Sequence, residues 1–457
     1  MTKNREPQQR ISIAITGSGG AGVMTAGGML LEAAAKGGWY ALQTRAVGPQ
    51  IRGGEAAALL RLSTTPVEIH DGAFDIVFAV DWMNFDRFAA EIKLTEQTIV
   101  LCDPEAGDPP MRVIDSGAIV QGVPIKGIAK QVEGARPNMI ALGVLAGTIG
   151  LPTETINELI TSKLKSKGEA AVSSSIAAAE AGYTAAGTLA DTPKLAPASA
   201  NPDDHWIITG NQAAALGAVR GGIRFAAAYP ITPATEVLEW LSSALPKVGG
   251  RLVQAEDELA SINMAIGASY GGIPSITATS GPGYALMTEA IGLAAASEVP
   301  VVIVDVMRGG PSTGIPTKSE QSDLNIAIYG LHGDAPHVVV APNSIADCMF
   351  TTQWAAHLAD AMQVPAVVLS DQLLGQTSVV IEKPANVTFL AKRLVANEPG
   401  EAYNRYAVTE SGISPMALPG TAGGQYTADG LTPSPDGRPA TKAEDQQTQL
   451  HKRPQKL

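Results

Sequence analysis

The sequence predicts an α/β protein with two successive α/β domains, and three observations support this prediction. Short apolar runs alternate with helical patterns along most of the chain, in the order expected of parallel strands joined by helices. Of the 457 residues, 45% are hydrophobic and only 17% are charged. The chain also contains 48 glycines and 31 prolines, as is typical of buried strands connected by many tight turns.

Composition and charge argue against several classes of protein. The net charge of −12 argues against a nucleic-acid-binding surface. No apolar run approaches the ~20 residues that a membrane span needs. The polar start MTKNREPQQR leads straight into a strand, so we expect a cytoplasmic protein without a signal peptide. Cys102 and Cys348 are expected to be buried free thiols, and without a CxxC pair they cannot ligate an iron–sulfur cluster or zinc by themselves.

Residues 10–185 are expected to form the first domain. The strand ISIAIT is followed by a glycine-rich turn and by the helix AGVMTAGGMLLEAAAKGG. Further strands are predicted at AALLRLS, FDIVFAV and QTIVLCD, with helices around 137–150 and 153–182. This alternation predicts a parallel sheet with helices on both faces. The small, polar and aperiodic stretch 186–204 is expected to be a linker.

The turn after the first strand, GSGGAG at Gly17–Gly22, has the glycine spacing and the strand–helix context of a dinucleotide site. Such a site also needs an acidic residue about 20 residues later, but this region supplies Gln43 and Arg45 instead. Four alternatives follow: an NAD site, which the missing acid disfavours; an NADP site that uses Arg45; a tight turn for close packing; and a loop that binds another phosphate or shapes an interface. A second turn, Arg52-Gly53-Gly54, brings backbone and a cation together, and alone it indicates only a turn.

Residues 205–385 are expected to form a second, doubly wound domain. The helix GNQAAALGAVRGG precedes the strand IRFAAA, and the later strands SITATS, VPVVIVDV, HVVVAP and PAVVLS alternate with helical or loop segments. After this domain the pattern fades. Residues 386–457 are expected to be an extended tail, with 410–457 partly disordered or wrapped around a partner.

Three loops of the second domain follow strands, and such loops meet at one edge of a parallel sheet. They contain YPITP, the turn Ser280–Gly283, and a long segment that begins with Arg308. Thr232 is either the N-cap of a helix with Pro233 at its first position, or a hydroxyl that two prolines hold toward a ligand. Arg308 either ends its strand as a surface charge or grips an oxyacid. The convergence of the loops favours the ligand interpretations.

Three acidic residues, Glu256, Asp257 and Glu258, stand at the start of the helix DELASINMAIGASYGG. One interpretation is that they complement the helix dipole. The other is that one of them points inward. Glu258 begins a stripe that continues with Ile262 and Ala265, so its side chain is expected on the buried face, where a carboxylate can hold and share a proton.

These segments resemble a known family. YPITPATE, QAEDELASINMAIGAS and TSGPGYALMTEAIGLAAASEVPVVIVDVMRGGPSTGIPTKSEQSDL are very similar to the α subunit of 2-oxoacid:ferredoxin oxidoreductases, which are thiamine diphosphate enzymes. GSGGAGVMTAGGMLLEAA and GPQIRGGEAAALLRLS resemble the γ subunit, fused ahead of α as in the 2-oxoglutarate type. The resemblance covers about residues 10–385. It implies a γ-type α/β domain that is not a nicotinamide site, followed by a doubly wound pyrimidine-binding domain of a thiamine diphosphate enzyme.

The resemblance also implies roles for single residues. Glu258, which matches the glutamate of the family's E-x8-G helix, would be the catalytic carboxylate against N1′ of the aminopyrimidine. Thr232 and Arg308 would bind the 2-oxo acid. No metal ligand is expected in this chain, and no residue is assigned to coenzyme A, the acyl acceptor. The residues expected to bind the cofactor are Tyr229, Pro230, Ile231, Glu258, Ser280, Gly281, Pro282 and Gly283.

Partners are implied in the same way. The sequence has neither the GDG-type motif for diphosphate and Mg²⁺ nor cysteines for a cluster, so a β subunit would carry the diphosphate, Mg²⁺ and a 4Fe–4S cluster. The active site would lie at the α–β interface, ferredoxin would accept the electrons, and a dimer of γα/β units is expected. Fused α chains of this family usually continue into a transketolase-like domain, whereas this sequence stops at KRPQKL.

The implied reaction is the coenzyme A-dependent oxidative decarboxylation of a 2-oxo acid, foremost 2-oxoglutarate to succinyl-CoA, or the reverse carboxylation. Pyruvate and branched 2-oxo acids are alternative substrates. The second carboxylate of 2-oxoglutarate would need a cation, and Lys318 and Arg220 are candidates unless they are ordinary surface charges. An NADP-linked oxidoreductase that uses Gly17–Gly22 and a non-catalytic scaffold subunit are the competing hypotheses.

Overall fold

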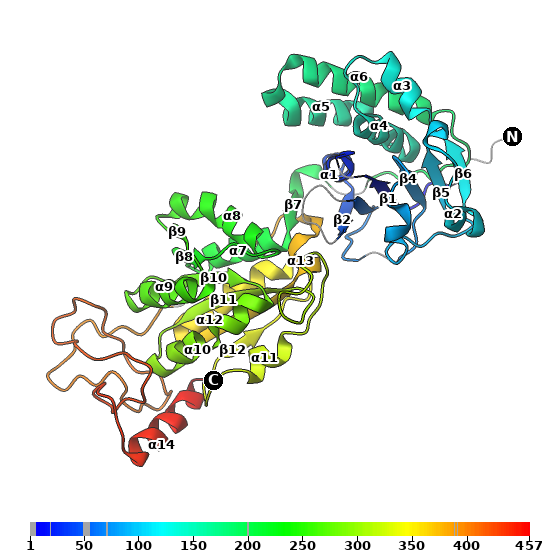
Figure 1. Ribbon diagram of the computed structural model, residues 1–457. Helices are drawn as coiled ribbons and strands as arrows, with labels where there is room; N and C mark the ends of the chain where they lie inside the picture. Colours follow the sequence, from blue (N-terminus) through cyan, green and yellow to red (C-terminus); the bar gives the residue numbers. More distant parts are fainter. Residues whose placement is uncertain are drawn as a thin grey trace. The chain divides into compact units, whose positions relative to one another are not determined.

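A computed structural model describes residues 6–18, 20–48, 55–69, 72–198, 201–387, 389–390 and 392–457 (Figure 1). The chain divides into two compact units. Unit 1 consists of Met1–Ile208 and Thr377–Ala385, and unit 2 of Thr209–Gln376 and Asn386–Leu457. Within the described ranges, no helix combines the length and the apolar composition needed to cross a membrane.

Unit 1 is built on an eight-stranded mixed sheet in the order β6-β5-β4-β1-β3-β2-β14-β7. Strands β1, β4, β5 and β6 run parallel, whereas β3 is antiparallel to both β1 and β2. The predicted all-parallel sheet is therefore wrong. Only residues 48–55 join β2 to β3, and a parallel pair needs a crossover of about a dozen residues or more. The strands are β1 (Arg10–Gly17), β2 (Tyr40–Val47), β3 (Ala56–Ser63), β4 (Ile76–Ala79), β5 (Ile99–Cys102), β6 (Ile119–Gly122), β7 (His205–Thr209) and β14 (Ser378–Glu382).

Strand β14 comes from the part of the sequence that was expected in the second domain. It pairs antiparallel with β2, through Ser378 opposite Gln43 and Val379 opposite Leu42, and so extends the sheet of unit 1. The chain thus returns to unit 1 after it has built most of unit 2. Such a return cannot be recognised from a local pattern, because the strand SVVIE looks like any other short strand.

The helices of unit 1 pack mainly on one face of its sheet, where α4 is buried between α1 and α6. The single helix expected over 153–182 is two helices, because the chain breaks at Gly168, whose φ of 93° favours glycine. A smaller apolar cluster with Phe74, Phe85 and Phe88 covers the other face. The helices are α1 (Val23–Lys36), α2 (Met111–Asp115), α3 (Ile125–Gln131), α4 (Pro137–Ile149), α5 (Thr153–Leu164) and α6 (Glu169–Ala186).

Unit 2 contains a six-stranded parallel sheet in the order β12-β13-β11-β10-β8-β9. One face packs against α7, α8 and α12, and the other against α9, α10 and α11. The doubly wound fold predicted for this part is thus confirmed. The strands are β8 (Phe225–Ala228), β9 (Arg251–Gln254), β10 (Ser275–Thr279), β11 (Val301–Met307), β12 (Val338–Val340) and β13 (Pro365–Asp371). The helices are α7 (Gly210–Arg220), α8 (Thr235–Ala244), α9 (Glu258–Tyr270), α10 (Gly281–Ser297), α11 (Leu324–Tyr329), α12 (Asp347–Met362) and α13 (Gln372–Gln376).

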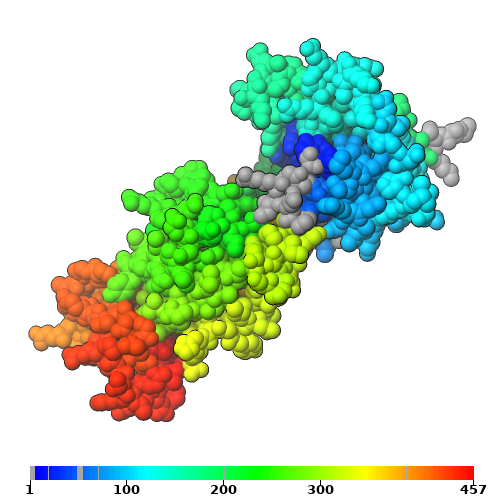
Figure 2. All heavy atoms as spheres, viewed as in Figure 1, coloured from blue at the N-terminus to red at the C-terminus, as the bar shows by residue number. Residues whose placement is uncertain are grey.

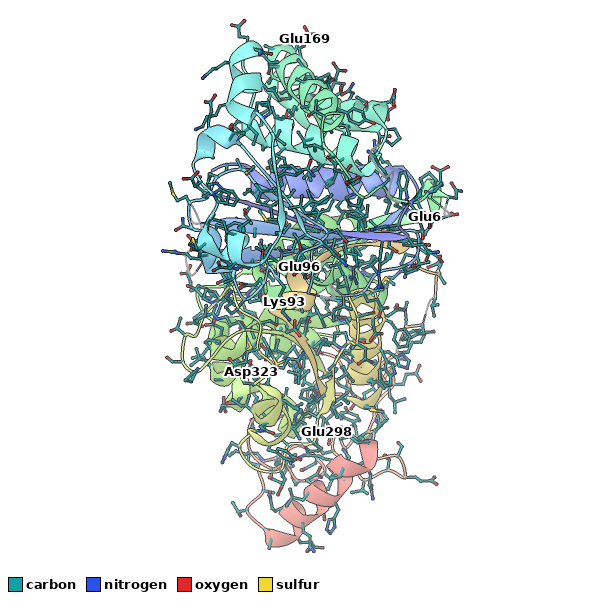
Figure 3. The ribbon with its side chains drawn as sticks, turned by 90° about the vertical axis from the view of Figure 1, so that its right-hand side faces the viewer. Glu6, Lys93, Glu96, Glu169, Glu298 and Asp323 are labelled. Carbon is teal, nitrogen blue, oxygen red and sulfur yellow. The ribbon has the colours of Figure 1, made fainter. Side chains whose placement is uncertain are left out.

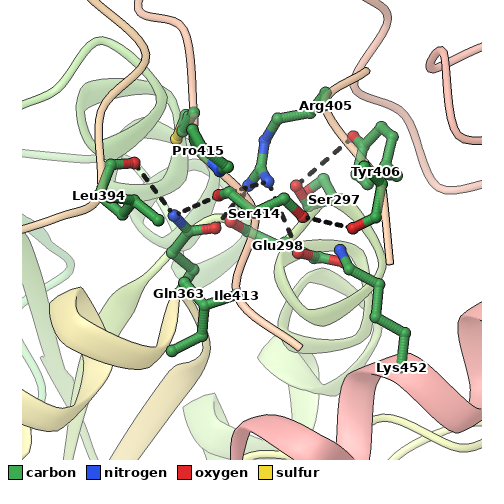
Figure 4. A network of polar contacts seen from close by, with 12 residues as sticks. Ser297, Glu298, Gln363, Leu394, Arg405, Tyr406, Ile413, Ser414, Pro415 and Lys452 are labelled. Atoms are coloured by element: carbon green, nitrogen blue, oxygen red, sulfur yellow. Dashed lines mark hydrogen bonds and ion pairs between the residues drawn. The ribbon is translucent and has the colours of Figure 1, made fainter. Parts of the chain in front are cut away.

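The C-terminal segment, 392–457, is packed on unit 2 rather than partly disordered, and α14 (Ala443–Lys452) near its end is followed by a short 3-10 helix, Arg453–Lys456 (Figure 2). A buried ionic network fastens it to the turn after α10 (Figure 4). The Glu298 carboxylate accepts from Lys452 Nζ at 2.6 Å and from Lys456 Nζ at 2.7 Å, and Arg405 Nη1 lies 3.5 Å away. Residues expected to form a loose tail therefore contribute buried charges to the core of unit 2.

Both cysteines are free and buried, as predicted, Cys102 at the end of β5 and Cys348 in α12. Burial raises the pKa of each thiol. A thiol that is kept protonated and away from solvent is a poor nucleophile and a poor metal ligand, so both cysteines act here as small apolar side chains.

Candidate functional site

The carboxyl edge of the parallel sheet in unit 2 gathers the loops in which site residues were predicted. Residues 229–234 follow β8, Ser280 follows β10, and residues 308–323 follow β11. Because β8, β10 and β11 are neighbours in the sheet, these loops emerge side by side. Ligands bind at this edge in open α/β sheets.

Arg308 joins two of these loops. The residue is only 7% exposed, and its Nη1 donates to the main-chain oxygen of Thr232 at 2.6 Å. Its Nε and Nη2 donate to the main-chain oxygen of Thr313 at 3.1 and 2.6 Å. A guanidinium has five N–H groups, so one donor on each terminal nitrogen remains beyond these bonds. Burial lowers the pKa of this guanidinium, but arginine stays charged.

The loop that contains Thr232 does not cap a helix in the predicted way. Helix α8 begins at Thr235 with Ala234 in the N-cap position, so the N-cap interpretation of Thr232 is wrong. Thr232 is half-buried, and its main-chain oxygen is held by Arg308. Tyr229 is 41% exposed, whereas Ile231 packs against the apolar core. Pro230 is half-buried, so this loop presents polar and apolar groups at the rim of the site.

The three acids at the start of α9 differ in their positions: one caps the helix and another is buried. Asp257 is the N-cap, because its carboxylate accepts from the Ala260 N–H at 2.7 Å. Glu256 and Asp257 are exposed, but Glu258 is only 7% exposed. Ile262 and Ala265 follow it on the buried face. The predicted inward orientation of Glu258 is confirmed.

The Glu258 side chain lies against the first turn of α10. A Cβ added to Gly283 would lie 2.6 Å from Glu258 Cγ and 2.7 Å from Glu258 Oε1, closer than atoms can approach. Glycine at this position therefore lets the carboxylate reach the helix. Ser280 is the N-cap residue of α10 and is fully buried, yet its hydroxyl has no hydrogen-bond partner among the described residues. The structure thus brings Glu258 and the turn Ser280–Gly283 together, with Gly281 and Pro282 half-buried between them.

The two candidate cations for a second substrate carboxylate differ in position. Arg220 ends α7 and precedes β8, so it lies at the amino end of that strand, opposite the edge that carries Thr232. Its guanidinium contacts Met349 Sδ at 3.2 Å and Asn386 Oδ1 at 3.4 Å. Lys318 is exposed in the same loop as Arg308, and its main-chain oxygen accepts from the Gly309 N–H at 2.9 Å. Of these two residues, Lys318 lies in the loop at the carboxyl edge of the sheet and Arg220 at the opposite edge.

The glycine-rich turn of unit 1 is closed by a carboxylate. Asp81 Oδ2 accepts from Ser18 N at 3.0 Å and from Ser18 Oγ at 2.8 Å. A negative group at this turn disfavours a pyrophosphate there, which weakens the NADP alternative. A cavity of about 870 Å³ adjoins the turn, and its lining includes the cationic residues Lys126 and Arg136. The turn Arg52-Gly53-Gly54 lies outside the described residues.

Sequence reasoning missed a pair of acids near the start of α10, of which Asp305 is fully buried and Asp323 half-buried. Asp305 lies in the middle of β11 and is fully buried, and Asp323 precedes α11. Figure 3 marks Asp323 at this place in unit 2. Each carboxyl group contributes to the pKa shift of the other, so the two groups are neighbours. The available signal was the single acid in the apolar strand VPVVIVDV, because a charge in a buried strand requires a partner.

Among the described residues, no three or more His, Cys, Asp or Glu side chains are grouped so that they could hold a metal ion. The site at the sheet edge therefore consists of one buried carboxylate, one buried guanidinium, a helix start and main-chain oxygens. Such groups can bind an organic acid and place a carboxylate against a ring nitrogen.

Two family descriptions match this chain. Residues 216–452 match "Pyruvate flavodoxin/ferredoxin oxidoreductase, thiamine diP-bdg", and residues 12–185 match "Pyruvate ferredoxin/flavodoxin oxidoreductase". The "2-oxoacid:ferredoxin oxidoreductase subunit alpha" of Sulfolobus sp is 32% identical over 92% of this chain and 74% of that protein. The chain belongs to the 2-oxoacid:ferredoxin oxidoreductase family. The predicted family is thus confirmed, and the candidate site lies within its thiamine diphosphate-binding segment.

Other members of the 2-oxoacid:ferredoxin oxidoreductase family match as well. The "2-oxoglutarate synthase subunit KorA" of Methanothermobacter marburgensis is 46% identical over 43% of this chain, which corresponds to 53% of that protein. The chain thus spans about half the length of this relative. A solved structure, "2-oxoglutarate:ferredoxin oxidoreductase from Magnetococcus marinus with 2-oxoglutarate, coenzyme A and succinyl-CoA bound", superposes with a TM-score of 0.92 at 37% identity. That superposition covers 98% of this chain and 78% of the Magnetococcus chain.

Proposed function

We propose that this chain is the γα subunit of a 2-oxoacid:ferredoxin oxidoreductase that acts on 2-oxoglutarate. The reaction converts 2-oxoglutarate and coenzyme A to succinyl-CoA and carbon dioxide, and two electrons pass to ferredoxin, or it runs in reverse. The observation that carries the proposal is the buried Glu258 carboxylate beside the first turn of α10, at the edge where Arg308 and Thr232 meet. The Magnetococcus enzyme supports the choice of substrate, because its structure contains 2-oxoglutarate and succinyl-CoA.

The residues at the sheet edge fit the aminopyrimidine half of thiamine diphosphate. Glu258 is buried beside the first turn of α10, where its carboxylate could face a ring nitrogen. When bound, the cofactor supplies a nucleophilic carbon and an electron sink for decarboxylation. Glu258 would hold and move the proton at N1′ of the ring. The loops at Tyr229–Ile231 and Ser280–Gly283 would enclose the ring and exclude water.

Arg308 and Thr232 would bind the reacting end of the 2-oxo acid. The two donors that Arg308 has beyond its bonds to Thr232 and Thr313 suit a carboxylate or a carbonyl oxygen. The Thr232 hydroxyl adds a donor from the opposite loop. Lys318 is the candidate cation for the second carboxylate, because it lies in the loop that begins with Arg308.

The partners belong to the same proposal. We assign the diphosphate, Mg²⁺ and the 4Fe–4S cluster to a separate β subunit, because the only two cysteines of this chain are buried and free. Ferredoxin, a dimer of γα/β units and a cytoplasmic location complete the proposal. Coenzyme A would contact the unit 1 cavity that Gly20 and Gly22 line.

A substrate comparison tests the proposed function. The chain is produced with its β subunit, and reduction of a viologen dye is measured with 2-oxoglutarate, pyruvate and a branched 2-oxo acid, each with and without coenzyme A. We expect coenzyme A-dependent reduction that is fastest with 2-oxoglutarate. Faster turnover of pyruvate would reassign the substrate, and dye reduction by NADPH alone would replace the proposal with the nicotinamide hypothesis.

A further inference from the structure

Two acidic side chains meet beneath the first turn of α10. Asp305 points from the middle of β11, and its register partner in β10 is Thr279, directly before the N-cap of α10. Asp323 ends the long loop after β11. A Cβ on Gly281 would lie 2.6 Å from Asp323 Oδ2, so this carboxyl group is pressed against the first residue of α10. The two acids therefore reach one place from separate segments of the chain.

If both carboxyl groups are ionised, neither can donate a hydrogen bond to the other. Asp305 Oδ1, Asp305 Oδ2 and Asp323 Oδ2 are buried, and none has a hydrogen-bond partner among the described residues. An ionised carboxylate only accepts hydrogen bonds, so two of them side by side repel each other and form no bond. One added proton turns one carboxyl into a donor and the other into its acceptor. This single change satisfies the contact and removes one of the two buried charges.

The surroundings favour this protonated state. Burial raises the pKa of Asp305 well above its ordinary value, and Asp323 raises it further. Burial and the nearby Glu320 also raise the pKa of Asp323, while its contact with Asp305 acts in the opposite direction. Around the pair lie Tyr284 on α10, Thr279 on β10, Leu369 on β13, Glu258 on α9 beyond Gly283, and Glu320 in the loop itself.

The pair fixes one end of the loop that holds Arg308. At its start, Arg308 Nε and Nη2 donate to Thr313 O in the same loop. In its second half, Gln321 Nε2 donates to Asp371 Oδ2 at 2.7 Å. This bond ties the loop to β13, and Asp323, at the far end of the loop, adds the contact with α10. A loop that is held at both ends keeps the Arg308 guanidinium in position against Thr232.

We infer that Asp305 and Asp323 share one proton, and that the resulting hydrogen bond positions the loop 309–323 and with it the substrate-binding Arg308. The second half of this inference rests on the proposed function. Both acids would act through the loop that holds Arg308, so both are positioning residues. Loss of the shared proton at alkaline pH leaves two like charges in contact, which loosens the loop and raises the KM for the 2-oxo acid. The shared proton is a property of this chain and does not depend on the proposed function.

Conservative variants distinguish the effect of the shared proton from the effect of the net charge of the Asp305–Asp323 pair. Asp323→Asn replaces the shared proton by an amide donor and leaves one carboxylate, so it preserves both the hydrogen bond and the net charge of the pair. In the assembled enzyme, wild-type KM for 2-oxoglutarate should rise at alkaline pH with a smaller change in kcat. Asp323→Asn and Asp305→Asn should keep the neutral-pH KM and remove this rise. Asp323→Ala should raise KM about tenfold at neutral pH, because a hydrogen bond of the pair is lost.

Infrared spectroscopy of the isolated full-length chain tests the shared proton without any turnover. We expect a carbonyl band of a protonated carboxyl group at neutral pH that both Asn variants lose. The matched control, Asp371→Asn, should keep it, because the Asp371 carboxylate already accepts from Gln321 and Leu374. Absence of the band from the wild-type chain would overturn the shared proton. A band that is present, together with a KM that Asp323→Ala leaves unchanged, would overturn the positioning role. Failure of the assembled enzyme with every 2-oxo acid would refute the proposed function and leave the infrared result intact.

Discussion

Arg308 Nη1 donates to the main-chain oxygen of Thr232 at 2.6 Å, although the two residues are 76 positions apart in the sequence. The bond connects the loop after β8 with the loop after β11 at the carboxyl edge of the sheet. A side chain that uses some of its donors on its own backbone is held in place before a ligand arrives. This pre-organisation reduces the entropy lost when an oxyanion binds to the remaining donors.

Arg308→Lys and Arg308→Ala should both raise the KM for the 2-oxo acid more than they lower kcat. Lysine keeps the charge but has no planar fork, so it cannot hold the Thr232 and Thr313 oxygens at the same time. Alanine also removes charged hydrogen bonds, each worth about 1.5–3 kcal/mol, so we expect its KM to rise by about tenfold to a hundredfold. Steady-state kinetics of the assembled enzyme check this. Unchanged constants in both variants would remove Arg308 from the site.

Gly283→Ala should lower turnover by displacing Glu258. The added Cβ would lie 2.7 Å from Glu258 Oε1 and closer still to Thr279 Oγ1, so these two side chains or the start of α10 must move. Gly292→Ala is the matched control in the same helix, because its Cβ would meet only the His332 oxygen at 3.9 Å. It should retain activity, and the gain in helix propensity is worth up to ~1 kcal/mol. Equal activity of the two variants would contradict the close approach of Glu258 to α10.

Glu298→Gln should destabilise unit 2 and make its free energy of unfolding depend less on pH in the acidic range. Lys456, Lys452 and Arg405 outweigh the effect of burial and lower the pKa of Glu298 from 4.5 to about 2. The ionised carboxylate therefore contributes stability above pH 4.5, and this contribution is lost as the pH falls toward 2. Removing one member of a buried ionic network costs about 3–5 kcal/mol. Denaturant unfolding at pH 7 and at acidic pH checks this.

The exposed Glu239 of α8 provides the control for that experiment. Glu239→Gln should change the free energy of unfolding by less than about 0.5 kcal/mol. If Glu298→Gln behaved like Glu239→Gln at both pH values, the network in Figure 4 would not hold the C-terminal segment in place.

Local sequence patterns were sufficient to predict part of the fold and part of the candidate site. The doubly wound sheet of unit 2 follows from alternating apolar strands and helices, and the inward Glu258 follows from its place at the start of a buried helical stripe. The glycine motif alone left several alternatives open, because its spacing suits a tight turn as well as a phosphate site. The carboxylate of Asp81 that closes this turn comes from the end of β4 and is invisible in the motif itself.

The remaining features depend on contacts between distant segments. The antiparallel β3, the return of β14 to unit 1 and the burial of Lys452 and Lys456 each require a partner that no local window contains. The true start of α8 also escaped prediction. Thr232 and Pro233 fit a helix start locally, but the structure uses the Thr232 oxygen to bind Arg308 and begins the helix at Thr235.

The role of Glu258 is tested most directly by Glu258→Gln in the assembled enzyme, with viologen reduction by 2-oxoglutarate as the readout. Glutamine keeps the size of the side chain but cannot hold and transfer the proton at the cofactor nitrogen, so turnover should fall by about a hundredfold or more while the subunits still assemble. Glu256→Gln, at the exposed neighbour, should leave turnover unchanged. Wild-type turnover in Glu258→Gln would contradict the assignment of Glu258 as the catalytic carboxylate.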